Sequence, residues 1–242
     1  MNKAAVFDLD GTIYFGSKIA DFALQTIDEL ESNGYNVLFF TNNSTKTRVE
    51  ILDKLIHMGI RTAVDKIYTS AYASAIFLQR KDLRNIFLVG SRGFKSELTN
   101  ADINVEDEYS CEAVVIGLDL NFNYEILSRA LIALQKSRRI IVANTDKNFP
   151  VENGLLRPGA NAMLSAILGS IGEEIKLDIV GKPNPFMLEI LCKDWELDKQ
   201  HIVVVGDRIE SDMAMAKNFN CKGILVGDNI TLLDVKNKIL RS

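Results

Sequence analysis

Four short polar segments carry the residue types that can do chemistry, and each directly follows an apolar run. They read Asp8-Leu9-Asp10-Gly11-Thr12, Thr41-Asn42-Asn43-Ser44, Gly181-Lys182-Pro183-Asn184-Pro185, and Gly206-Asp207-Arg208 with Asp212 further on. Short buried apolar runs of this kind are typical of strands. In an open parallel sheet the carboxyl ends of the strands share one edge, and ligands bind there. The sequence therefore predicts that aspartates, a threonine and a lysine from distant segments meet at one edge.

These residue types favour the binding and transfer of a phosphoryl group. Several carboxylates on one edge repel one another unless a cation lies between them, and oxygen ligands of this kind suit Mg²⁺. Lys182 adds a positive charge, while Thr41 and the backbone of Asn42 and Asn43 add hydrogen-bond donors. An aspartate can act as a covalent nucleophile. A second carboxyl two residues away lies on the same side of an extended strand, where it can give a proton. Phosphoryl transfer needs mainly positioning and charge neutralisation, which this set supplies.

The elements that must position these side chains alternate between strand and helix. The candidate strands show little alternation of polar and apolar residues, as expected for strands covered on both faces. They span residues 3–7, 37–40, 86–89, 113–116, 140–143, 177–180, 202–205 and 223–226. Apolar stripes at helical spacing lie between them, such as Val49, Leu52 and Ile56 before Gly59. This order predicts an α/β fold with a doubly wound, mostly parallel, Rossmann-like sheet.

The middle of the chain is expected to form a domain of its own. The stretch from about Asp82 to Glu174 contains strands and helices, but the four polar segments lie outside it. We interpret it as a smaller α/β domain inserted into a host domain. The expected boundaries are residues 1–78 and 177–242 for the host and 79–176 for the insertion.

Composition excludes several other classes of protein. With 28 Lys and Arg against 32 Asp and Glu, the net charge is −4, which argues against broad nucleic-acid binding. Apolar runs stay short of the roughly 18 residues of a membrane-spanning helix, and Asp8 comes too early for a secretory signal. Three scattered cysteines and two histidines argue against a disulfide scaffold or a multi-histidine metal centre. We expect a soluble, cytoplasmic protein whose partner is a small phosphorylated metabolite.

Taken in order, the four segments resemble the four motifs of the haloacid dehalogenase-like phosphatases. The Thr-Asn-Asn and Gly-Lys-Pro-Asn-Pro forms resemble the nitrophenyl phosphatase-like branch, subfamily IIA. In that branch a large α/β cap is inserted between the second and third motifs, which matches the insertion inferred above. The similarity spans nearly the whole chain. It implies a Mg²⁺-dependent phosphatase that hydrolyses small phosphate monoesters through an aspartyl-phosphate, and cap-mediated homodimers are common among similar proteins.

The resemblance also implies roles in catalysis and phosphate binding. Asp8 would be the nucleophile and Asp10 the acid/base. Thr41 and Lys182 would hold the phosphoryl oxygens. The dehalogenases of the family lack the second aspartate of the first motif, and the transport-ATPase relatives have threonine there. The presence of Asp10 therefore indicates hydrolysis of the phosphoenzyme.

A metal site follows from the same resemblance. Asp8, the main-chain carbonyl of Asp10 and Asp207 would bind Mg²⁺. Asp212 would support these ligands without touching the ion.

Other functions stay open at this point. A phosphomutase would pass the phosphate to a sugar instead of water. A receiver-like phosphorylation switch also uses Mg²⁺, aspartate, threonine and lysine, although receivers are about half this length and their acceptor aspartate ends a later strand. A catalytically dead phospholigand-binding protein is a third alternative.

The candidate residues also have ordinary structural interpretations. Thr41 by itself would be a helix N-cap, followed by two turn asparagines. Lys182 would be a surface lysine, and Asp207 and Asp212 would cap a helix. In the insertion, Asn144-Thr145-Asp146 reads as a simple turn, with a role in substrate choice as the alternative.

Overall fold

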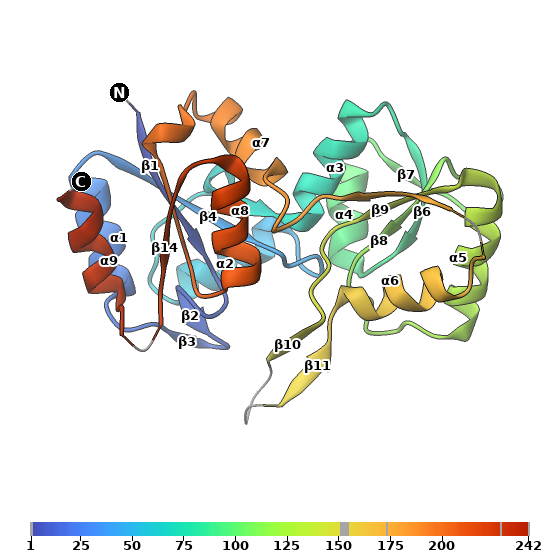
Figure 1. Ribbon diagram of the computed structural model, residues 1–242, viewed down its shortest axis with the longest axis horizontal. Coiled ribbons are helices and arrows are strands. Elements are labelled where there is room, and N and C mark those ends of the chain that lie inside the picture. Colours follow the sequence, from blue (N-terminus) through green and yellow to red (C-terminus); the bar gives the residue numbers. More distant parts are fainter. Residues whose placement is uncertain (1, 151–154, 173, 228, 242) are drawn as a thin grey trace. The chain divides into compact units, whose positions relative to one another are not determined.

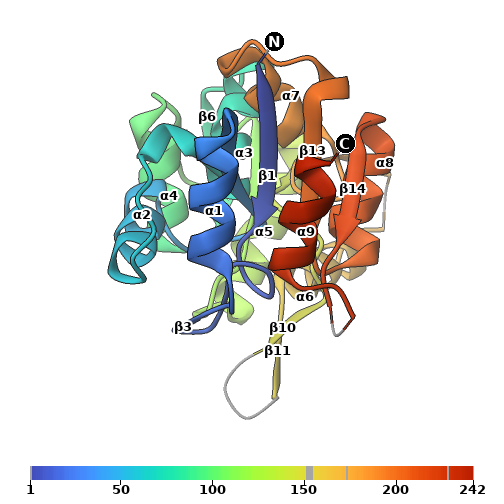
Figure 2. The same cartoon turned by 90° about the vertical axis from the view of Figure 1, so that its left-hand side faces the viewer.

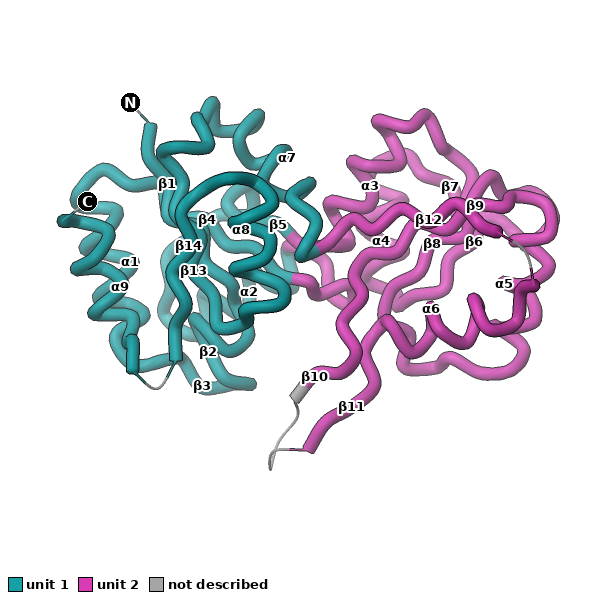
Figure 3. Tube along the Cα trace, viewed as in Figure 1, with its two compact units in different colours: residues 1–41, 49–68, 182–242 teal, residues 42–48, 69–181 magenta. Residues whose placement is uncertain are grey.

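The computed structural model of the chain describes residues 2–150, 155–172, 174–227 and 229–241 (Figure 1). It divides into two compact units (Figure 3). The first contains Met1–Thr41, Val49–Tyr68 and Lys182–Ser242, and the second contains Asn42–Arg48 and Thr69–Gly181. Over these described ranges, no helix is both long and apolar enough to cross a membrane.

The first unit is built on a parallel sheet with the strand order β14-β13-β1-β4-β5. Its strands are β1 (Lys3–Asp8), β4 (Tyr35–Thr41), β5 (Ile67–Thr69), β13 (Ile202–Gly206) and β14 (Lys222–Leu225). A short antiparallel pair, β2 (Tyr14–Phe15) and β3 (Lys18–Ile19), follows β1. Its helices are α1 (Ala23–Ser32), α2 (Arg48–His57), α7 (Phe186–Asp194), α8 (Ala214–Phe219) and α9 (Leu232–Leu240). Short 3₁₀ turns, η1 (Val64–Lys66) and η3 (Lys199–His201), and one π-helical turn, η4 (Ile209–Met213), complete it.

Strand β1 lies in the middle of this sheet because both of its faces are apolar. Residues 4–7 are fully buried, and alternate side chains of a strand point to opposite faces. Phe7 packs with Ile27 of α1 and Val235 of α9. These two helices pack against each other in front of β1 (Figure 2). Burial on both faces explains why the strand reads as a continuous apolar run.

The second unit has its own parallel sheet, with the order β12-β9-β8-β6-β7. The strands are β6 (Asn85–Val89), β7 (Asn104–Val105), β8 (Ala113–Ile116), β9 (Arg139–Val142) and β12 (Lys176–Ile179). An antiparallel pair joins β10 (Asn148–Pro150) to β11 (Leu156–Pro158). The helices are α3 (Ser70–Arg80), α4 (Arg92–Asn100), α5 (Tyr124–Ser137) and α6 (Ala160–Gly169).

The predicted fold class is confirmed, and each expected strand is present within two residues of its expected ends. The expected domain boundaries differ from the division into units. Strand β12 was assigned to the host domain, but it hydrogen-bonds to β9, with Leu177 opposite Ile140, in the sheet of the second unit. Helix α3 also belongs to that unit instead of the host. The assignment of β12 was wrong because an apolar run in the sequence does not reveal which sheet the strand joins.

Candidate active site

Three of the predicted residues lie at the carboxyl edge of the first unit's sheet. Strand β1 pairs with β4, which places Asp8 opposite Phe40, so Thr41 is the next residue along β4. On its other side β1 pairs with β13, which places Phe7 opposite Val205. Strand β13 ends at Gly206, so Asp207 directly follows it. The register of the sheet therefore brings the ends of these three strands to one edge.

Three carboxylates form a cluster at this edge. Asp8, Asp207 and Asp212 each offer an oxygen, and these atoms lie within 4.8 Å of one another. Asp8 and Asp212 are buried and Asp207 is half-buried. In the part of the chain that the structure describes, this is the one group of three or more such side chains close enough to share a metal ion.

Gly11 allows Asp207 to approach the turn after β1. Its backbone has a φ of +94°, and a Cβ at this position would overlap the Asp207 carboxylate. Thr12 Oγ1 lies 3.4 Å from Asp207 Oδ1, to which it donates. The glycine of the first motif is thus required by a left-handed turn and by close packing against the cluster.

Lys182 bridges two members of the cluster. Its Nζ lies 2.5 Å from Asp8 Oδ1 and 2.7 Å from Asp212 Oδ1. All three side chains are buried, and the lysine nitrogen is 4.5 Å from the centre of the Phe40 ring. The second oxygen of Asp212 accepts a hydrogen bond of 3.0 Å from the backbone N–H of Arg208. Both oxygens of Asp212 therefore have protein partners, so its carboxylate holds the lysine and the loop after β13.

The charges of this cluster do not balance. Burial raises the pKa of the Asp8 carboxyl to about 8; Lys182 opposes this rise and Asp212 adds to it. Burial and Asp212 also raise the pKa of Asp207. Burial works to lower the pKa of Lys182, but Asp212 and Asp8 outweigh it and raise that pKa, so the lysine stays charged. One lysine cannot neutralise three carboxylates, so the oxygen-rich cluster fits a divalent cation of the hard type.

Asp10 lies just beyond the cluster and is exposed. Its Oδ2 accepts a hydrogen bond of 3.2 Å from the hydroxyl of Tyr14, a buried residue of β2. Burial, together with Asp10, raises the pKa of Tyr14, so the hydroxyl remains a donor. Tyr14 was not among the residues predicted from the sequence. Its position at the start of β2, two residues after the first motif, is the one signal in the sequence that could have indicated it.

The two asparagines after Thr41 belong to the second unit, where their side chains make structural contacts. Asn42 Nδ2 donates to Asp146 Oδ1 over 3.1 Å, and Asn144 Nδ2 donates to the Asn42 carbonyl over 2.7 Å. Asn43 Oδ1 accepts from the backbone N–H of Thr45 over 2.9 Å.

The turn interpretation of Asn144-Thr145-Asp146 is consistent with a hydrogen bond of 3.1 Å from the Asp146 N–H to Asn144 Oδ1. The same turn also holds Asn42 in place. Phosphate binding by the backbone of Asn42 and Asn43 stays a prediction.

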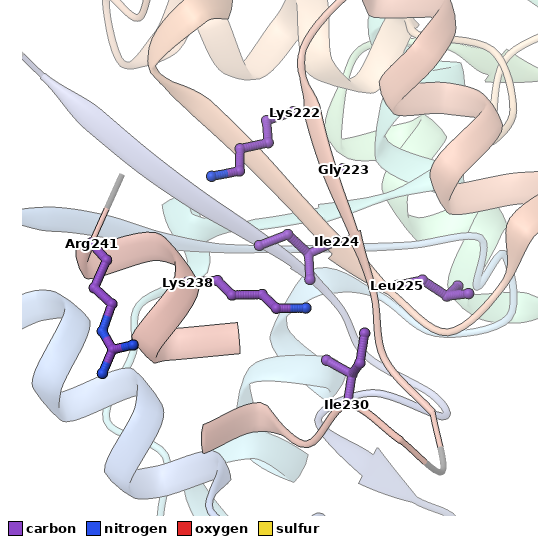
Figure 4. Close-up of a pocket in the computed structure, with 7 residues that line it drawn as sticks. All are labelled: Lys222, Gly223, Ile224, Leu225, Ile230, Lys238 and Arg241. Carbon is purple, nitrogen blue, oxygen red and sulfur yellow. The ribbon is translucent and has the colours of Figure 1, made fainter. Parts of the chain in front are cut away.

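A separate surface hollow of about 540 Å³ lies on the first unit, against edge strand β14 and helix α9 (Figure 4). Lys222, Lys238 and Arg241 line it together with apolar side chains that include Ile224 and Ile230. The described residues that line it do not include the site residues predicted from the sequence.

Comparisons with known proteins agree with the geometry. A family model described as haloacid dehalogenase-like hydrolase matches residues 5–104, and a second, described as HAD-hydrolase-like, matches residues 179–238. The acid sugar phosphatase of Staphylococcus haemolyticus is 36% identical over 230 residues, which are 95% of this chain and 86% of that protein. The acid sugar phosphatase of Staphylococcus aureus is 34% identical over 238 residues, covering 98% and 91%.

Solved structures give the same result. The 4-nitrophenylphosphatase of Thermotoga maritima is 28% identical, with a TM-score of 0.90 and coverage of 98% of this chain and 97% of that one. The p-nitrophenyl phosphatase of Archaeoglobus fulgidus, also 28% identical, has a TM-score of 0.87 and coverage of 100% and 92%. The chain belongs to the haloacid dehalogenase-like hydrolases. Within them it is an enzyme of the phosphatase class, and the predicted resemblance to the nitrophenyl phosphatase-like branch is confirmed.

Proposed function

We propose that the chain is a Mg²⁺-dependent phosphatase that hydrolyses small phosphate monoesters, sugar phosphates among them, through an aspartyl-phosphate at Asp8. The observation that carries the proposal is the cluster of Asp8, Asp207 and Asp212 around the buried ammonium of Lys182. Relatives named acid sugar phosphatase support the substrate class.

The proposed metal site uses Asp8, the main-chain carbonyl of Asp10, and Asp207. A bound divalent ion would supply positive charge beside these oxygens, which favours the ionised form of Asp8 and offsets the charge of the phosphoryl group. Asp212 is proposed to position the site without binding the ion, since one of its oxygens pairs with Lys182 and the other accepts from the Arg208 N–H.

The reaction then runs in two steps on the chain's own residues. An Asp8 oxygen attacks phosphorus, the bond from phosphorus to the leaving oxygen breaks, and Asp10 gives that oxygen a proton. Asp10 next takes a proton from water, whose oxygen attacks the same phosphorus and releases the Asp8 carboxylate and inorganic phosphate. Lys182 and Thr41 hold the phosphoryl oxygens in both steps. The net change is ester plus water to alcohol plus phosphate.

The second unit is proposed to act as the inserted cap domain of such an enzyme. The chain passes between the units at four points, and two of these, Thr41–Asn42 and Gly181–Lys182, directly adjoin predicted phosphate-binding residues. Location in the cytoplasm and association into a homodimer stay predictions.

A phosphate-release assay tests the function. The protein is incubated with a panel of sugar phosphates, phosphoglycolate, nucleotides and pyridoxal phosphate, in Mg²⁺ and in excess EDTA. We expect phosphate release in Mg²⁺ that EDTA abolishes, and a loss of several orders of magnitude in Asp8→Asn. Rearranged sugar phosphate without phosphate release would favour a mutase instead. A long-lived phosphoprotein without turnover would favour a switch.

A further inference from the structure

The turn that joins β1 to β2 fixes Tyr14 tightly to the end of β1. The backbone N–H groups of Ile13 and Tyr14 both donate to the Leu9 carbonyl, over 2.9 and 3.1 Å. The Gly11 N–H donates to the Tyr14 carbonyl over 2.8 Å. These backbone hydrogen bonds hold the two ends of the turn together, so Tyr14 has a defined position relative to Asp10.

The side chain of Tyr14 is held as firmly as its backbone. Only 1% of the residue is exposed, and it packs in the core cluster of the first unit with Phe39 and Leu55. The Nζ of Lys54, on helix α2, lies 3.5 Å from the centre of its ring, a cation–π contact. A buried ring with a cation on its face has little freedom to rotate, so its hydroxyl occupies a fixed point.

Asp10 is, by contrast, an exposed carboxyl at the rim of the site. An exposed side chain samples several rotamers, whereas a proton donor must be held within a narrow range of positions to act in both steps of a reaction. The hydroxyl of Tyr14 contacts this carboxylate and donates to its Oδ2 over 3.2 Å.

We propose that Tyr14 is a positioning residue for the acid/base Asp10. Its hydroxyl fixes Oδ2, so that Oδ1 is the oxygen that gives and takes the proton. Lys54 contributes by holding the ring of Tyr14. This inference rests on the proposed function, because it assigns a supporting residue to the group that protonates the leaving oxygen.

The leaving group of the substrate provides the test. An alkyl phosphate has a poor leaving group that needs a proton from Asp10, whereas 4-nitrophenolate leaves without one. The value of kcat/KM covers the steps up to formation of the phosphoenzyme. In Tyr14→Phe, which keeps the ring, we expect kcat/KM for glycerol phosphate to fall by about 10- to 100-fold. For 4-nitrophenyl phosphate it should change by less than about twofold, because that step needs no general acid.

Tyr68→Phe is the matched control. Tyr68 is also buried in the first unit, and its hydroxyl donates to Asp194 Oδ2 over 3.0 Å. Its removal deletes the same kind of hydrogen bond away from the cluster. We expect it to lower the melting temperature and to leave the ratio of the two kcat/KM values unchanged.

Equal losses on both esters in Tyr14→Phe, or no loss on either, would overturn the inference. If Tyr14→Phe does not fold, Lys54→Met serves as the second variant, because it retains the hydroxyl and frees the ring. We expect a smaller but equally selective loss on the alkyl ester, and an unselective loss overturns the inference as well. The parent and Asp8→Asn are assayed first, so that failure of the phosphatase proposal is recognised separately.

Discussion

The ammonium nitrogen of Lys182 lies 2.5 Å from Oδ1 of Asp8, although 174 positions separate the two residues in the sequence. Both are buried, and the same nitrogen also holds Asp212 at 2.7 Å. A lysine in this position serves the fold, because it compensates buried carboxylates, and it serves the proposed reaction, because it places a positive charge beside the nucleophile. The two roles can be separated by experiment.

Replacement of Lys182 is expected to damage both activity and stability. Lys182→Gln leaves Asp8 and Asp212 without their cation, and breaking a buried pair in this way costs about 3–5 kcal/mol in free energy of unfolding. Loss of a charge that stabilises the transition state lowers kcat by about 10²–10³-fold. Thermal or denaturant unfolding and phosphate release measure the two effects.

Lys236→Gln is the control for this variant. Lys236 is also a buried lysine of the first unit, paired with Glu29 over 2.6 Å. Its replacement should reduce stability and leave kcat unchanged. If both variants retained full activity in the folded state, Lys182 would have no role in the reaction.

Asp8→Asn is expected to change how stability depends on pH. The pKa of Asp8 is raised by burial from an ordinary value near 3.8 to about 8, so the metal-free folded state keeps a proton that the unfolded state releases. The parent therefore loses stability as pH rises through this window, by at most about 1.4 kcal/mol per pH unit from this group.

Asparagine has no proton to lose. In EDTA, the free energy of unfolding of Asp8→Asn relative to the parent should rise from about pH 4 to about pH 8 and then level off. Denaturant titrations at several pH values measure the difference. A difference that is flat or that falls with pH would contradict the assignment of a raised pKa to Asp8.

Gly11 and Gly16 form a natural pair for testing the approach of Asp207. Both have positive φ angles, +94° and +60°, but a Cβ on Gly11 meets the Asp207 carboxylate whereas one on Gly16 meets nothing within 4 Å. Alanine at either position should cost about 1–2 kcal/mol of backbone strain. Gly11→Ala should in addition lower kcat by up to about 100-fold, because it displaces a metal ligand. Equal kinetics for the two variants would show that the close approach has no functional role.

The Mg²⁺ concentration that activity requires is expected to depend on Asp207. We expect Asp207→Asn to raise the Mg²⁺ concentration needed for half-maximal activity by about tenfold or more, since it removes one anionic ligand. Asp198→Asn is the control, because Asp198 caps the exposed turn η3 and asparagine caps equally well. Magnesium titrations of activity compare them. An unchanged magnesium requirement in Asp207→Asn would remove this residue from the metal site.

The sequence alone was sufficient to predict where the strands lie and which residues at their carboxyl ends come together. Continuous apolar runs such as residues 4–7 predicted buried parallel strands, and the rule that ligands bind at the carboxyl edge predicted that Asp8 and Asp207 meet there. The same rule predicted correctly that Lys182 lies beside Asp8. It assumed, however, that the strand before Lys182 belongs to the same sheet as β1. Strand β12, which precedes it, pairs with β9 in the second unit, and Lys182 is the first residue of the chain's return to the first unit.

Other features could not be read from the sequence because they depend on three-dimensional packing. Val49 and Ile56 were expected on the buried stripe of α2, but both are exposed, and Ile51 and Leu55 are buried instead. The contact between Tyr14 and Asp10 depends on the closed turn between them. The buried face of α2 and the contact between Tyr14 and Asp10 both arise from how neighbouring segments pack, which periodicity and motifs do not specify.

The most direct test of the central claim is detection of phosphate on Asp8. The Asp10→Asn variant lacks the proposed base for the second step, so its phosphoenzyme should accumulate when it is mixed with 4-nitrophenyl phosphate and Mg²⁺ and quenched in acid. Peptide mass spectrometry should then find one phosphate on the peptide that contains Asp8, and reduction with borohydride should convert that aspartate to homoserine. A phosphate-free Asp8 during turnover, or phosphate found on another residue, would contradict the account.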